Sequence, residues 1–224
     1  SDRSTYKLLG GSIGFYGSTL NTRQYATKGY LEKLIAQVFT GRERFEPGNP
    51  QEGYSPSPQE RQSWLQISYM KEAYHTMGPK FTLGWMAEAL YSSKNFSENY
   101  TATMMQAGEF APTPHSKLMY NEAFRANQYV AAGIKPIYVL NDMFQFRTEF
   151  YGFTPIFPIK KNALNKAYYG KAFSRFEYMG EVSVICHLPF GAISAYVNHY
   201  SSPRREWNVG MTIGWQLFNY RFVE

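Results

Sequence analysis

Long stretches in which apolar and polar residues alternate constrain the fold of this chain more than any other feature. In the segment 206–222, two sets of alternating positions are clear: Trp207, Val209, Met211, Ile213, Trp215 and Leu217 on one face, and Asn208, Gly210, Thr212, Gly214 and Gln216 on the other. Successive side chains of a β-strand point to opposite faces, so this period of two predicts a strand with one apolar and one polar face. The same alternation recurs in 80–91, 143–153 and 170–187.

Nine segments have the character of strands, and most of them are long. They cover 4–16, 29–45, 62–75, 80–91, 125–140, 143–153, 170–187, 190–200 and 206–222. A tilted strand needs about 9–11 residues to cross a bilayer, whereas strands of soluble domains are most often about 5–6 residues long. The segment lengths therefore favour an all-β, antiparallel transmembrane β-barrel with about 8–10 strands in this chain.

The lengths of the connections support the same prediction if the last strand ends on the periplasmic side. The connections on that side are then tight, at 76–79, 141–142 and 188–189. Three connections on the opposite side are long, at 46–61, 92–124 and 154–169. The fourth, at 201–205, is short. Short periplasmic turns alternating with longer external loops are typical of bacterial outer-membrane barrels.

The composition agrees with strands at a membrane and excludes membrane-spanning helices. No stretch approaches the run of about 20 apolar residues that such a helix needs. Aromatic residues make up 18% of the chain; they fit pleated strands, and Trp and Tyr favour the water–lipid boundary. We therefore expect Trp85, Trp207 and Trp215 to lie at the lipid interface.

Several classes of functional site are disfavoured. Cys186 is the single cysteine, which excludes an internal disulfide or a CxxC metal site. The net charge of +6 comes from scattered residues, without the basic face or recognised module of a nucleic-acid-binding protein. The four histidines lack the spacing of metal ligands; they are His75, His115, His187 and His199. We expect no metal site, no cofactor and no nucleic-acid partner.

One short motif matches the nucleophile elbow of serine hydrolases. The run Gly10–Gly14 fits G-x-S-x-G around Ser12, but an elbow needs a helix after the turn, and 15–21 has no helical periodicity. We therefore predict a glycine-rich strand and no catalytic residue in this chain. An autonomous hydrolase would require Ser12 or Ser116 to lie within hydrogen-bond reach of a histidine, and the pair His115-Ser116 has no partner that the sequence identifies.

Charged residues on the polar faces of two neighbouring predicted strands are the strongest candidates for a functional role. They are Arg147, Glu149, Lys171, Arg175, Glu177 and Glu181. An arginine or lysine facing lipid at the bilayer midplane costs about 2–4 kcal/mol. We therefore expect these side chains to face the lumen and to pair across strands, either as a structural lining of ion pairs or as a selectivity or gating element for a solute.

Five segments resemble one known family: Thr19–Gly29, Gly41–Gly48, Asn121–Pro136, Arg147–Pro158 and Tyr169–Glu181. They are similar to the C-terminal barrel of outer-membrane patatin-like phospholipases of Gram-negative bacteria. The resemblance implies a preceding patatin domain with a Ser–Asp dyad, POTRA-like regions, a barrel related to surface-antigen proteins, and lipid acyl hydrolysis by the whole protein. It transfers no catalytic residue to this chain.

Residues 1–224 are therefore expected to form one outer-membrane β-barrel domain, a C-terminal fragment that anchors or displays a patatin-like phospholipase domain absent from this chain. The alternative is an outer-membrane channel or transporter with a polar, charged lumen. The expected partners are outer-membrane lipid, the barrel assembly machinery and the missing N-terminal domain, with association into a homo-oligomer left as an open alternative. Because bacterial barrels normally have an even number of strands, we predict an incomplete barrel in which 4–16 does not pair with 206–222.

Overall fold

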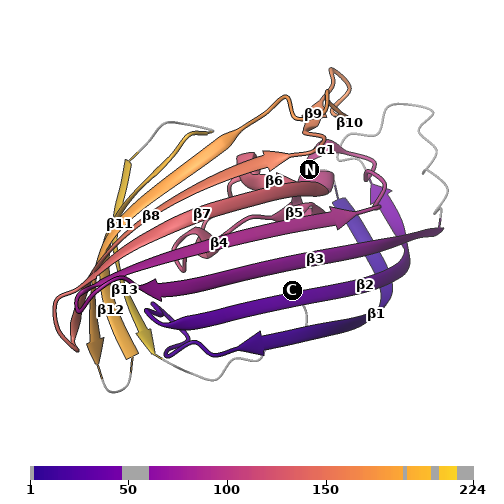
Figure 1. Cartoon of the computed structure of the whole chain (residues 1–224). Helices are drawn as coiled ribbons and strands as arrows, with labels where there is room; N and C mark the ends of the chain where they lie inside the picture. The colour runs from indigo at the N-terminus through magenta and orange to yellow at the C-terminus, as the bar shows by residue number, and fades with distance from the viewer. Residues whose placement is uncertain (1–2, 47–60, 189–190, 203–206, 216–224) are drawn as a thin grey trace, which may run out of the picture.

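A single antiparallel sheet of nine long strands dominates the computed structural model, which describes residues 3–46, 61–188, 191–202 and 207–215 (Figure 1). The strands follow the sheet order β1 (Arg3–Ser18), β2 (Gly29–Glu46), β3 (Arg61–Thr76), β4 (Phe81–Ser92), β7 (Gln128–Val139), β8 (Phe144–Pro155), β11 (Glu177–Leu188), β12 (Gly191–Tyr200) and β13 (Trp207–Trp215). Each corresponds to one of the nine predicted segments, so the prediction of an all-β, antiparallel fold is confirmed.

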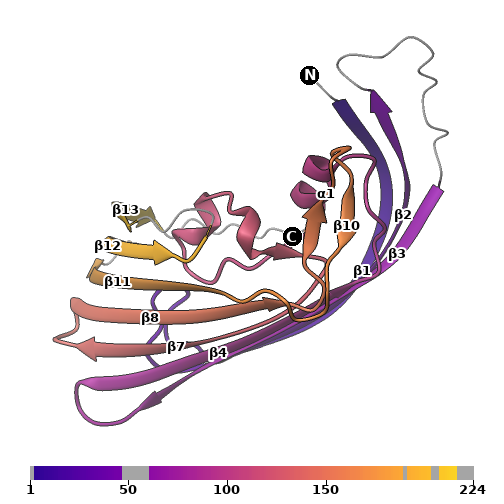
Figure 2. The same cartoon turned by 90° about the horizontal axis from the view of Figure 1, so that it is seen from above.

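The sheet is strongly curved and has a concave and a convex face (Figure 2). Within the described residues, β1 forms a ladder with β2 alone and β13 with β12 alone, so the sheet does not close on itself. The prediction that 4–16 does not pair with the last strand is confirmed for 207–215, the part of that strand that the structure describes. Residues 216–222 lie outside the described ranges.

In the central strands, the register places large apolar side chains on the convex face and buried charged ones on the concave face; charged residues also occur on the convex face toward the ends of β1 to β3, such as the pair Glu32–Lys71. Ile134 of β7 lies directly opposite Phe150 of β8, and both are exposed, at 52% and 53%. One position along β8, Glu149 lies opposite Glu181 of β11, and both carboxylates are buried. The exposed face of these strands is thus apolar, whereas the exposed face of an ordinary water-soluble sheet is polar.

Residues 93–127, between β4 and β7, fold onto the concave face. They contain α1 (Tyr100–Gln106), β5 (Gly108–Glu109), the 3-10 turns η1 (Ser116–Leu118) and η2 (Glu122–Phe124), and β6 (Arg125–Ala126). Asn99 caps α1 by accepting a hydrogen bond from the Ala102 amide at 2.7 Å. No helix in the described part of the chain is long and apolar enough to cross a membrane.

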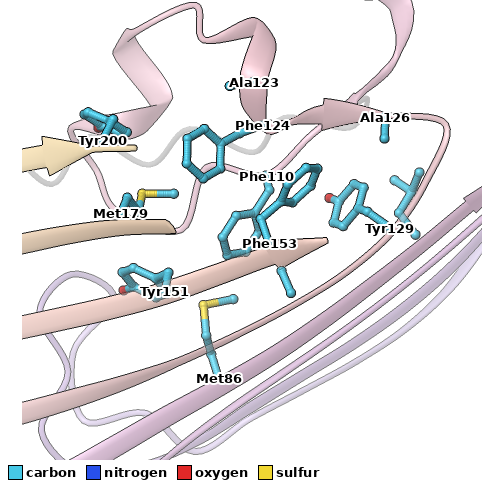
Figure 3. Close-up of a cluster of buried hydrophobic side chains, with 12 residues drawn as sticks. Met86, Phe110, Ala123, Phe124, Ala126, Tyr129, Tyr151, Phe153, Met179 and Tyr200 are labelled. Atoms are coloured by element: carbon cyan, nitrogen blue, oxygen red, sulfur yellow. The ribbon is translucent and has the colours of Figure 1, made fainter. Parts of the chain in front are cut away.

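An aromatic cluster holds this inward-folded segment against the strands (Figure 3). Phe110 stacks on Phe153 of β8 with ring centroids 5.9 Å apart, and Phe124 meets the same ring at 5.6 Å. Tyr129 of β7 completes the contact, with its ring centroid 5.0 Å from that of Phe153. The concave side is therefore occupied by packed side chains in this region.

A second connection, residues 19–28 between β1 and β2, also reaches the concave face. The Asn21 side chain organises the turn by accepting hydrogen bonds from the amides of Thr27 and Lys28. Gly29 closes it with φ +89°, and a Cβ there would lie 2.1 Å from the Thr19 carbonyl oxygen, so only glycine fits. Tyr25 adopts the left-handed region with φ 56° and projects its side chain away from the turn toward β12.

One predicted boundary is wrong and it affects two candidate residues. The sequence predicts a strand throughout 170–187, but β11 begins at Glu177. A turn precedes it, in which Phe173 has φ 52°, its amide donates to the Ile156 carbonyl, and the Ser174 amide donates to the Lys171 carbonyl. The short hairpin of β9 (Ile159–Lys161) and β10 (Ala167–Tyr169) lies just before this turn.

Candidate functional site

A network of buried ion pairs crosses the concave face of the central strands. Arg147 of β8 donates through Nε to Glu149 at 2.8 Å and through its other nitrogens to the Ala26 carbonyl at 2.8 Å and the Tyr74 hydroxyl at 3.2 Å. The Tyr151 hydroxyl donates to the second oxygen of Glu149 at 2.6 Å. Both carboxylate oxygens and the guanidinium therefore have partners, which a buried charge requires.

The network continues toward β3 through a lysine. Lys135 of β7 is buried, and its Nζ lies 2.6 Å from Glu72 of β3 and 3.4 Å from the Tyr74 hydroxyl. Tyr74 thus joins the Arg147–Glu149 pair to the Lys135–Glu72 pair. Within this network the groups satisfy one another, which is the behaviour of a structural lining.

A second polar set lies where the two inward-folded connections meet β11 and β12. The Nδ1 atom of His115 lies 2.8 Å from Glu181, and its Nε2 lies 3.3 Å from the Ser194 hydroxyl. The Tyr25 hydroxyl donates to the same Ser194 oxygen at 2.8 Å. His115 also stacks on Tyr196, with ring centroids 3.5 Å apart.

The direction of these hydrogen bonds follows from the chemistry of the groups. A carboxylate only accepts, so His115 carries a proton on Nδ1, and in its neutral form it accepts at Nε2 from Ser194. Ser194 in turn accepts from Tyr25. The result is one directed path from Tyr25 through Ser194 and His115 to Glu181, with His115 and Ser194 each only 1% exposed.

Beside this path, several buried polar atoms lack a hydrogen-bond partner among the described residues. Asn198 lies opposite Glu181 in the β11–β12 ladder and is buried. Neither polar atom of its amide, nor Oε2 of Glu181, has a hydrogen-bond partner among the described residues. Buried polar groups are nearly always satisfied in folded proteins, so this corner of the concave face is unusually polar for its degree of burial.

Of the other charged residues predicted to face the lumen, Glu177 lies on a strand, whereas Arg175 and Lys171 do not. Glu177 lies on the concave face and pairs with Arg175 at 2.7 Å, and it also accepts a hydrogen bond from the Ser201 hydroxyl. Arg175 and Lys171 belong to the turn before β11, and Lys171 is exposed. The expectation that these two residues lie on a strand face is wrong, because the left-handed turn at Phe173 delays the strand.

The three tryptophans expected at a lipid interface lie on strands. Trp85 of β4 is partly exposed and its Nε1 lies 3.4 Å from Nε2 of His75. Trp207 of β13 is 71% exposed. The side chain of Trp215 lies outside the described part of the structure.

The nucleophile-elbow reading of Gly10–Gly14 is excluded by the secondary structure. Ser12 lies within β1, which continues as a strand to Ser18 instead of turning into a helix. Ser116 hydrogen-bonds to Thr113. The serine that meets a histidine is Ser194, which the sequence did not single out.

No protein-family model, curated protein or solved structure matches this chain. The resemblance of its segments to patatin-like phospholipase barrels therefore stays a prediction. Among the residues that the structure describes, no three His, Cys, Asp or Glu side chains gather closely enough to hold a metal ion.

Lys94, just beyond the end of β4, should be unusually reactive. Burial lowers the pKa of its ammonium to about 8, although the nearby Glu43 carboxylate acts in the opposite direction. At pH 8 about half of the Lys94 amines are then neutral, compared with well under ~1% for a lysine of ordinary pKa. We expect an acetylating reagent limited in amount to modify Lys94 several times faster than Lys166, as measured by peptide mass spectrometry. Equal rates would contradict this prediction.

Proposed function

We propose that this chain is part of an outer-membrane β-barrel domain that serves as a membrane anchor, with the convex face of its sheet against lipid. The observation that carries the proposal is the sorting of side chains between the two faces. Large apolar residues are exposed on the convex face of most strands, among them Ile13, Leu34, Val38, Ile134, Phe146, Phe150, Val182, Val209, Met211 and Ile213. Soluble monomers rarely expose apolar patches of more than a few hundred Å².

The charged residues support the same orientation. Arg147, Glu149 and Lys135 all point to the concave side, where they are paired. On the lipid side each of the two cations would cost about 2–4 kcal/mol at mid-membrane depth. The strands of the main sheet contain 9–18 residues each, which suffices to cross a bilayer when tilted.

Within lipid, the outer edges of β1 and β13 require partners. Unpaired backbone N–H and C=O groups in the hydrocarbon region cost several kcal/mol each. The proposal therefore includes further strands that complete the barrel between these two edges. It also includes outer-membrane lipid and the barrel assembly machinery as partners.

An anchor explains the concave face better than an open channel does. The inward-folded residues 93–127 pack an aromatic cluster against β7 and β8, and 19–28 binds the side chain of Arg147 through a backbone carbonyl. The Arg147–Glu149 and Lys135–Glu72 pairs satisfy one another instead of lining an open path. Together with the resemblance of five segments to patatin-like phospholipase barrels, this favours a domain that holds a lipid-hydrolysing domain at the outer membrane.

Charges introduced on the convex face test the proposal. We expect Ile134→Lys and Phe150→Lys each to lower the free energy of unfolding in lipid vesicles by about 2–4 kcal/mol, because a lysine would face hydrocarbon. Denaturant titration monitored by tryptophan fluorescence measures the change. The matched control is Leu164→Lys, at a 79% exposed position between β9 and β10, which should be nearly neutral. If Ile134→Lys and Phe150→Lys were as neutral as the control, the convex face would meet water and the membrane proposal would fail.

A further inference from the structure

We propose that Ser194, His115 and Glu181 form a hydrolytic site on the concave face, with Tyr25 as the donor that stabilises the oxyanion, and that its substrates are esters of short acyl groups. This activity goes beyond anchoring and uses only side chains of this chain. The three residues come from β12, from the inward-folded residues 93–127 and from β11.

The geometry matches the requirements of an activated serine. A nucleophile must lie within hydrogen-bond reach of a base, and the base must be oriented by a third group. The distances are 3.3 Å from the Ser194 hydroxyl to Nε2 of His115 and 2.8 Å from Nδ1 to Glu181. Glu181 holds the tautomer in which Nε2 is free to take the proton of Ser194.

Tyr25 is held where a developing negative charge would need a donor. Its hydroxyl lies 2.8 Å from the Ser194 oxygen, close to the position that the oxygen of an attacked carbonyl would take. Two buried side chains of β8 fix the turn: Gln145 donates to the Tyr25 carbonyl at 3.1 Å and Arg147 to the Ala26 carbonyl at 2.8 Å. The left-handed φ of 56° at Tyr25 is a strained conformation of the kind that clusters at functional sites.

The reaction balances with water as the only co-reactant. The Ser194 oxygen bonds to the ester carbonyl carbon as its proton passes to Nε2 of His115, and the oxyanion accepts a hydrogen bond from Tyr25. The carbon–oxygen bond to the alcohol then breaks, and the alcohol leaves with the proton from Nε2. Water next attacks the acyl-serine, gives a proton to Nε2, and the carboxylic acid departs as that proton returns to Ser194.

The burial of Ser194 and His115 limits the size of the substrate, and it also suggests a competing, purely structural role for His115. Because His115 and Ser194 are each 1% exposed, a substrate reaches the serine only when 19–28 or 93–127 moves, which favours small acyl groups. The competing explanation is that His115 merely fastens the inward-folded segment to β11 and β12. A fastening role predicts a loss of stability on substitution, but it predicts no covalent chemistry at Ser194.

The test is covalent capture of the serine in the folded full chain. A small fluorophosphonate reacts with serines that have an activated hydroxyl, and peptide mass spectrometry identifies the modified residue. We expect modification at Ser194, its loss in Ser194→Ala, and a rate lowered at least 100-fold in His115→Gln. Ser183→Ala is the matched control, because Ser183 is buried on the same face of β11 and its hydroxyl has no hydrogen-bond partner among the described residues; it should leave modification of Ser194 unchanged.

Tyr25→Phe is a second test variant, needed in case His115→Gln does not fold. It keeps the ring of Tyr25 and removes only the hydroxyl. We expect it to lower kcat for p-nitrophenyl acetate by about 10²-fold, the effect of removing one oxyanion donor, with little change in KM. Absence of fluorophosphonate modification in the folded wild-type chain would overturn the proposal. So would modification of Ser194 at a rate that neither His115→Gln nor Tyr25→Phe changes.

Discussion

Arg147→Met is expected to destabilise the folded chain by about 3–5 kcal/mol, because it leaves the buried Glu149 carboxylate without its arginine partner. The substitution also removes the donors to the Ala26 carbonyl and the Tyr74 hydroxyl. Denaturant titration of the chain in lipid vesicles measures the change in the free energy of unfolding.

Two further variants identify the cause of that loss. Arg147→Met combined with Glu149→Leu removes both charges and should recover most of the stability, because no unpaired charge then remains in the buried network. Lys166→Met is the surface control: Lys166 lies 3.9 Å from Glu98 with both side chains substantially exposed, and such pairs contribute about 0–1 kcal/mol. If Arg147→Met cost no more than Lys166→Met, the buried network would not be a stabilising element.

Gly133→Ala should have the second largest effect. A Cβ at Gly133 of β7 would lie 2.1 Å from the Tyr151 ring and 2.7 Å from the Phe150 carbonyl oxygen. The oxygen belongs to the backbone of β8 and cannot move without disturbing the ladder, so we expect a loss of about 3 kcal/mol, at the upper end of ordinary overpacking.

Gly11→Ala is the matched control for that substitution. Gly11 also lies within a strand, and a Cβ there meets no atom within 4 Å. Its substitution should change the free energy of unfolding by less than about 1 kcal/mol. Comparable losses for the two variants would contradict the close contact at Gly133.

The strands could be predicted from the sequence because their alternation is long and regular. In β8, for example, Phe146 and Phe150 alternate with Arg147 and Glu149, and the structure separates these pairs onto opposite faces. The start of β11 could not be predicted, because the left-handed conformation of Phe173 has no signature in the sequence. Lys171 and Arg175 therefore precede the strand on which the sequence pattern places them.

The contacts among the polar residues around Ser194 could not be predicted from the sequence. His115 lies in a connection without periodicity, and its partners are 66 and 79 residues further along the chain. The sequence does not indicate that Lys135 pairs with Glu72, because the two residues are 63 positions apart on strands separated by β4. Local patterns determine which face a residue occupies, whereas inward folding of 19–28 and 93–127 depends on contacts across the whole sheet.

The attachment of residues 19–28 to distant strands has a consequence for the order of folding. The Tyr25 and Ala26 carbonyls are bound by side chains 120 and 121 residues later, and the Tyr25 hydroxyl by one 169 residues later. Although β1 and β2 precede β8 and β12 in the sequence, the connection between β1 and β2 can reach its final conformation only after β8 and β12 are in place. Contacts of such sequence separation are slow to form because the loop that they close has a high entropic cost. The β1–β2 hairpin is therefore completed later than strands that follow it in the sequence.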